Sequence, residues 1–163
     1  MKHGTERRSA PRSRLKPSQI RHVAGRRFSD AKCLLAAGRT HANGAIYLAG
    51  IAIECHLKAE LLAAYPSLAS AVPSRLPAAD RKRWDLLFRW HDLVGLLETL
   101  PGTLAFIRTS AGSNGGRVVE HLKQVAAVWS VMIRYDSKDA DPDDARDFVA
   151  RAEEVHRCLA RRP

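Results

Sequence analysis

Residues 45–62 read AIYLAGIAIECHLKAELL, and this stretch decides the fold. Its first half is apolar on every side, which is typical of a helix buried among other helices. Two opposite charges follow one helical turn apart, Glu54 and Lys58. A buried carboxylate needs a cation and hydrogen-bond donors, or it takes up a proton. We therefore predict a central helix from about residue 45 to 64 in which Glu54 and Lys58 form an internal ion pair.

Two side chains from other parts of the chain are candidate partners for Glu54, namely His91 and Arg134. Such a group has two interpretations: a polar tie that fixes how the helices pack, or direct participation in chemistry. The polar tie is favoured, because buried ion pairs more often specify packing than catalyse a reaction.

Three other long segments have the spacing of amphipathic helices. Apolar residues recur at steps of three and four over residues 20–35, 118–132 and 145–159. Pro17, Ser18 and Pro142 suit helix starts, and Gly38 suits a stop. We predict helices over about 17–37, 118–135 and from 142 onward, a short helix at 93–97 and a short packed segment at 84–90, with loops at 66–82, 109–116 and 136–141. The fold class is an all-α bundle of four main helices plus short helical segments, in one domain over residues 17–163.

The net charge of +10 is concentrated near the start of the chain. Residues 1–27 hold nine Lys or Arg and one acid, Glu6, whereas the remainder holds 18 basic and 16 acidic residues. A basic arm can attract nucleic acid by releasing counterions. No aromatic residue precedes Phe28 to stack on bases, so a disordered arm over residues 1–16 is the favoured interpretation.

Several classes of protein are not expected. No apolar run reaches the ~18 residues of a membrane span, because Glu54 interrupts the longest. The start of the chain has no apolar segment of a secretory signal, and the three cysteines suit reduced thiols, so we expect a cytoplasmic location without membrane attachment. Adjacent Cys55 and His56 point to different helix faces, so neither a metal site nor another cofactor is expected.

The order of several short motifs resembles the HEPN family. Residues 47–59 resemble its second-helix signature, and His91-Asp92-Leu93 resembles the start of a later helix. Arg134-Tyr135 follows Trp129 at the predicted end of the next helix, before an acidic loop and a final helix. The resemblance covers roughly residues 28–160. It implies a helical bundle that forms a homodimer and takes part in RNA cleavage, in toxin–antitoxin or antiviral defence systems, or as an inactive partner of a nucleotidyltransferase.

Active members of that family carry an arginine followed within a few residues by a histidine. The histidine can act as acid or base on RNA while the arginine stabilises phosphate charge. Here Arg134 is present, but residues 134–142 read RYDSKDADP and contain no histidine. Arg151 and His156 match the bare spacing, but five helical steps turn them apart, so we interpret that match as coincidence.

The resulting prediction is a non-catalytic binding or regulatory protein of a prokaryotic nucleic-acid-related or defence system. Glu54, Lys58, His91, Arg134 and Tyr135 are expected around one cleft, with Lys58, Arg134 and Tyr135 binding RNA or a nucleotide. Two alternatives stay open. One is a metal-independent endoribonuclease toxin that uses His91 and Arg134, and the other is a structural dimerisation module for a nucleotidyltransferase-type partner. A cognate antitoxin is a further possible partner.

The glycine-rich segment Gly112–Arg117 precedes a predicted helix and resembles an anion-binding start. It lacks the Gly-Lys-Ser/Thr of a P-loop, so a mobile connector is the favoured interpretation.

Overall fold

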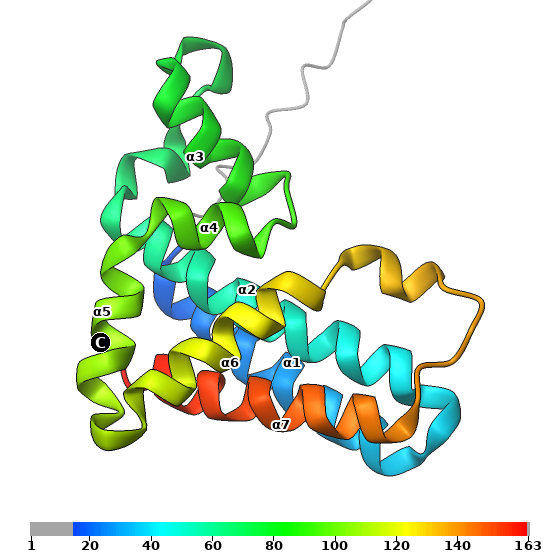
Figure 1. Ribbon diagram of the computed structural model, residues 1–163. Helices are drawn as coiled ribbons and strands as arrows, with labels where there is room; N and C mark the ends of the chain where they lie inside the picture. Colours follow the sequence, from blue (N-terminus) through cyan, green and yellow to red (C-terminus); the bar gives the residue numbers. More distant parts are fainter. Residues whose placement is uncertain (1–14, 163) are drawn as a thin grey trace, which may run out of the picture.

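The computed structural model describes residues 15–162, and every element in that range is helical, with no strand (Figure 1). The all-α prediction is thereby confirmed for this range. The four longest helices are α1 (Pro17–Ala37), α2 (Ala42–Ala64), α6 (Gly115–Val128) and α7 (Pro142–Leu159). The shorter elements are α3 (Ala78–Phe88), α4 (Leu93–Thr99), α5 (Pro101–Ser110) and the 3₁₀ turns η1 (Arg39–His41), η2 (Pro66–Ser70), η3 (Pro73–Arg75), η4 (Gly112–Asn114) and η5 (Val131–Tyr135).

The predicted basic arm, residues 1–16, lies outside the described residues except for Leu15 and Lys16. Lys16 is the N-cap of α1, and its backbone N–H donates to Oε1 of Gln19 at 3.0 Å. This bond satisfies a donor that the start of a helix leaves without an intrahelical partner. Ser18 lies in the first turn, as predicted.

Helix α2 is the centre of the bundle. Fourteen of its 23 residues are buried, among them Ile53, Leu57 and Leu61, and each such side chain contributes about 1.5–3 kcal/mol on burial. In Figure 1, α1 and α7 run alongside α2, while α3 and α4 pack near its C-terminal end. None of the helices between residues 15 and 162 has the length and apolar character needed to cross a bilayer.

The helix predicted to run from residue 118 to Tyr135 ends earlier, at Val128. Trp129 is extended, and its buried indole lies against Gly50 of α2 while Nε1 donates to the carbonyl of Tyr47 at 3.2 Å. Ser130 then caps η5 by accepting from the backbone N–H of Met132. The helix stops because the Trp129 side chain turns toward α2.

Two predicted loops are more ordered than expected. The segment 66–82 contains η2 and η3, as a loop with short helical turns would, but α3 already begins at Ala78 after Pro77. The segment 109–116, predicted as a flexible loop, is divided between the end of α5, η4 and the start of α6. A Cβ at position 115 would overlap the backbone of Arg108, so Gly115 lets α6 start directly against α5.

Candidate functional site

The charged pair in the middle of α2 is buried, as the sequence predicts. Glu54 is 2% exposed, and the ammonium of Lys58 lies 2.6 Å from its Oε1. The same ammonium donates to the carbonyl of Trp90 at 2.9 Å. Lys58 therefore neutralises Glu54 and also fastens α2 to the connection between α3 and α4.

His91 completes this arrangement, which we call the Glu54 cluster (Glu54, Lys58 and His91). Nδ1 of His91 lies 3.1 and 3.0 Å from the two oxygens of Glu54. The next residue, Asp92, caps α4 by accepting from the backbone N–H of Gly95 at 2.8 Å, which fixes the backbone that carries the imidazole. The prediction that His91 is a partner of Glu54 is therefore confirmed.

The Glu54 cluster orients an imidazole toward the surface. An ionised carboxylate only accepts hydrogen bonds, so His91 donates Nδ1–H to Glu54, and in the neutral form of the ring this tautomer leaves the lone pair on Nε2. The side chain of His91 is 46% exposed, so a ligand can reach it. A carboxylate that orients a histidine in this way serves equally well for a polar tie or for acid–base chemistry.

Arg134 lies in a second group, which we call the Arg134 cluster (Tyr47, Arg134 and Tyr135). Its guanidinium donates to the hydroxyl of Tyr47 at 3.3 Å and lies 5.7 Å from the Tyr47 ring centre and 4.6 Å from the Tyr135 ring centre. The hydrogen bond to Tyr47 raises the pKa of Arg134 above its usual value, so this group is always positively charged. The cluster therefore combines a fixed cation with two aromatic rings.

The two clusters are separate hydrogen-bonded groups, and the single cleft expected from the sequence stays a prediction. Within residues 15–162, Arg134 forms no hydrogen bond or ion pair with Glu54, Lys58 or His91. Tyr47 precedes Glu54 by seven helical residues, or about 10 Å along α2. Arg134 is directed to the N-terminal half of α2 because the extended residue Trp129 turns the chain there.

Sequence reasoning missed Tyr47 as a site residue, although Tyr47 lies on the same helical stripe as Glu54. It also missed a second buried carboxylate on α2, Glu60, whose Oε2 accepts from Thr103 at 2.5 Å and from Arg162 at 2.5 Å. Thr103 and Arg162 are 43 and 102 residues away in the sequence, so no local pattern could identify them.

A third missed feature is a pair of histidines in the interior. Nε2 of His56 lies 2.9 Å from Nδ1 of His156, and the His156 ring stacks on Phe28 at 4.6 Å between centres. Burial lowers the pKa of His56 to about 3, with further lowering from His156 and Arg21, and burial also lowers the pKa of His156. Both rings are thus neutral near pH 7, so one can donate and the other accept.

In the part of the chain that the structure describes, no group of three or more His, Cys, Asp or Glu side chains is placed to hold a metal ion. The structure thus offers two polar clusters, one around an oriented histidine and one around an exposed arginine. No protein-family model, curated protein or solved structure matches this chain.

Proposed function

We propose that this chain is a HEPN-like, non-catalytic RNA-binding protein that acts as a regulatory component of a prokaryotic defence or toxin–antitoxin system in the cytoplasm. The observation that carries the proposal is the Arg134 cluster. Tyr135 is 66% exposed, and the guanidinium of Arg134 lies over one face of its ring. An exposed ring can stack on any base, and an adjacent guanidinium can bind a phosphate, which together suit single-stranded RNA.

The proposal that the chain is not catalytic is supported by the residues around Arg134. Its partners among residues 15–162 are tyrosines, and residues 135–142 contain no histidine that could move a proton. Lys58, predicted as a phosphate ligand, already donates to Glu54 and to the Trp90 carbonyl, so we assign it to the polar tie. Phosphate binding without an adjacent acid or base supports recognition rather than cleavage.

Binding of a fluorescent single-stranded RNA, followed by anisotropy, tests the proposal. We expect Arg134→Ala to weaken binding at least tenfold, or about 1.4 kcal/mol, and to lower the salt dependence by about one phosphate contact. The matched control is Arg75→Ala, which removes an exposed arginine near the opposite end of α2. Equal affinities for the two variants, or no binding by the wild type, would refute the proposal.

A second candidate function, metal-independent endoribonuclease activity, is favoured by the oriented imidazole of His91. In that case Nε2 would accept a proton from an RNA 2′-hydroxyl while Glu54 stabilises the imidazolium. RNA cleavage in the presence of a chelator distinguishes the two functions. If the wild type cleaves RNA and His91→Ala does not, the endoribonuclease function replaces the binding proposal. If both proteins cleave RNA no faster than a blank without protein, the binding proposal is supported.

We also propose that two copies of the chain form a homodimer. The support is two exposed apolar side chains at the end of α6 and in η5: Val128 is 70% exposed and Met132 63%. Exposed apolar side chains gathered in one region are typical of protein interaction surfaces. The same face could instead bind a nucleotidyltransferase-type partner, as in the dimerisation-module alternative. The homodimer forms from this chain alone, whereas the alternative requires the partner protein.

A further inference from the structure

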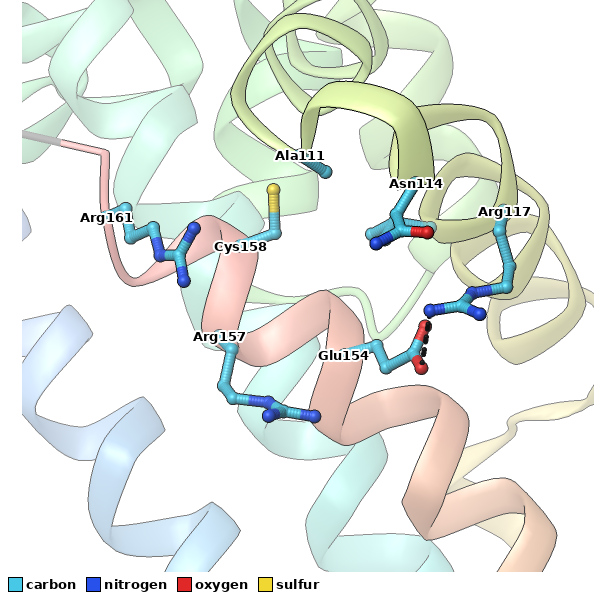
Figure 2. A pocket seen from close by; sticks show the side chains of 8 residues that line it. Ala111, Asn114, Arg117, Glu154, Arg157, Cys158 and Arg161 are labelled. Atoms are coloured by element: carbon cyan, nitrogen blue, oxygen red, sulfur yellow. Dashed lines mark ion pairs between the residues drawn. The ribbon is translucent and has the colours of Figure 1, made fainter.

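A pocket at the other end of the bundle is lined by three arginines, and we call it the arginine pocket. It lies between the turn that joins α5 to α6 and the C-terminal end of α7, and its volume is about 220 Å³. Figure 2 shows Arg157 and Arg161 along α7, with Ala111, Asn114 and Arg117 on the other side of the recess. The remaining lining residues are Val118, Glu154 and Cys158.

The spacing along α7 explains why these side chains line the same recess. Arg157 lies three residues after Glu154 and four before Arg161, and Cys158 lies four after Glu154 and three before Arg161, so the four residues share one side of the helix. That face meets the turn containing Asn114 because Gly115 brings α6 against the end of α5. The glycine-rich segment, expected to be a connector, contains η4 and the start of α6 and forms one wall of the pocket.

The pocket has a surplus of positive charge. Its lining holds three guanidinium groups and one carboxylate, Glu154, which lies 3.3 Å from Arg117 and 3.1 Å from His121. Within the described range, neither Arg157 nor Arg161 has an ion-pair partner. Cys158 is buried, and burial raises the pKa of its thiol, so it adds no negative charge at neutral pH. The lining thus carries a net charge of about +2.

The N-terminal end of α6 adds hydrogen-bond donors on the opposite wall. Asn114 is the N-cap of this helix, yet its side chain accepts no bond from the first turn. The side-chain amide of Asn114 is therefore available to a ligand, and the positive end of the helix dipole lies on the same side as Arg117.

We propose that the arginine pocket binds the terminal phosphate of a small phosphorylated molecule. A phosphomonoester carries close to two negative charges at pH 7, which matches the lining, whereas a carboxylate or a phosphodiester carries one. Guanidinium groups bind phosphate oxygens through paired N–H donors. The pocket is large enough for a phosphate group but encloses little of the molecule attached to it. The pocket therefore recognises the ligand mainly by the charge of its phosphate. This inference is independent of RNA binding at Arg134.

Titration calorimetry on the full chain tests this with four probes: inorganic phosphate, adenosine monophosphate, cyclic adenosine monophosphate and adenosine. We expect the first two to compete for one site, the cyclic diester to bind at least tenfold more weakly than the monophosphate, and adenosine not to bind. Binding of inorganic phosphate without binding of the monophosphate would show that the pocket takes only the free anion, and would overturn the proposal of a phosphorylated molecule.

Three variants locate the site. Arg157→Gln and Arg161→Gln should each weaken monophosphate binding at least tenfold, while Arg151→Gln, an exposed arginine of α7 outside the pocket, should leave it unchanged. Ala111→Leu keeps every charge but fills the recess, so it should also abolish binding. Circular dichroism melts identify any variant that fails to fold. Equal binding by all folded variants, or equal affinity for the monoester and the diester, would overturn the proposal.

Discussion

Gly50 permits the contact that shapes the end of α6. A side chain at this position would overlap the indole ring of Trp129, which is a rigid group held by its own hydrogen bond to α2. Glycine inside a helix usually costs about 0.5–1 kcal/mol relative to alanine, and here the packed indole compensates for that cost.

We therefore expect Gly50→Ala to lower the free energy of unfolding by about 1–3 kcal/mol, because the indole must move out of its packed position. The matched control is Gly25→Ala in α1, where a Cβ meets nothing within 4 Å. That change should raise stability by about 0.5–1 kcal/mol. Urea denaturation measures both, and a stabilising effect at position 50 would contradict the packing described for Trp129.

The His56–His156 pair makes the stability of the fold depend on pH. The folded-state pKa of His56 is about 3, below its ordinary value of 6.5, so between these values the unfolded chain binds a proton that the folded chain does not. Stability is therefore complete above about pH 6.5 and falls as the pH decreases toward 3. The slope is about 1.4 kcal/mol per pH unit for each such proton.

Removing one member of the pair should weaken this acid dependence. Between pH 6.5 and 4, we expect the free energy of unfolding of His56→Gln to change less with pH than that of the wild type. His41→Gln changes an exposed histidine and should keep the wild-type dependence on pH. Urea denaturation at a series of pH values provides the comparison. An unchanged slope in His56→Gln would show that this ring does not resist protonation in the folded state.

At the scale of elements, the Glu54 cluster connects α2 to the α3–α4 connection. Lys58→Met leaves Glu54 buried with His91 as its remaining partner, and we expect a loss of about 3–5 kcal/mol. Adding Glu54→Leu should recover most of that loss, because it removes the uncompensated charge. For comparison, Arg151→Met removes an exposed pair with Asp147 and should change stability by less than about 1 kcal/mol. If the loss of stability in the Lys58→Met and Glu54→Leu double variant equals the sum of the losses in the two single variants, the two side chains do not interact as an ion pair.

The elements that the sequence predicts correctly are those whose signals are local. α7 begins at Pro142 with Asp141 as its N-cap, and both residues are adjacent to the apolar stripe they introduce. α6 ends early for a reason that is not local, since Trp129 contacts a backbone carbonyl 82 residues away. α3 is not predicted as a helix: it begins at Ala78, within the segment that its three prolines mark as a loop, and extends into the short packed segment expected at 84–90.

In the candidate site too, local patterns predict some contacts, and contacts between distant segments are not predictable from the sequence. Glu54 and Lys58 could be paired from their spacing of four residues, and His91 was identified among two possible partners. The other candidate, Arg134, lies with Tyr47 instead, because the choice depends on which half of α2 the segment after α6 reaches. His156 gave no recognisable signal, since its partner His56 is 100 residues away.

At the scale of the whole molecule, the homodimer proposed above predicts a specific oligomeric state. Sedimentation velocity should give twice the 18.0 kDa chain mass for the wild type. A Val128→Glu and Met132→Glu double variant should sediment as a monomer, because two carboxylates would be buried without partners. Val72→Glu, at an exposed apolar residue of the η2–η3 connection, should remain dimeric. A monomeric wild type would favour the dimerisation-module alternative with another protein.

The central place of α2 has a consequence for synthesis on the ribosome. α1 and α2 are consecutive and can form a hairpin as soon as they emerge, but α7 follows the end of α2 by 77 residues. At about 5–20 residues per second, the nascent hairpin waits about 4–16 s for that last helix. During this interval the apolar side of α2 that α7 later covers is exposed to solvent, and Glu60 lacks its cation, Arg162. The newly made chain is thus most open to chaperones, and most prone to aggregate, before α7 is added.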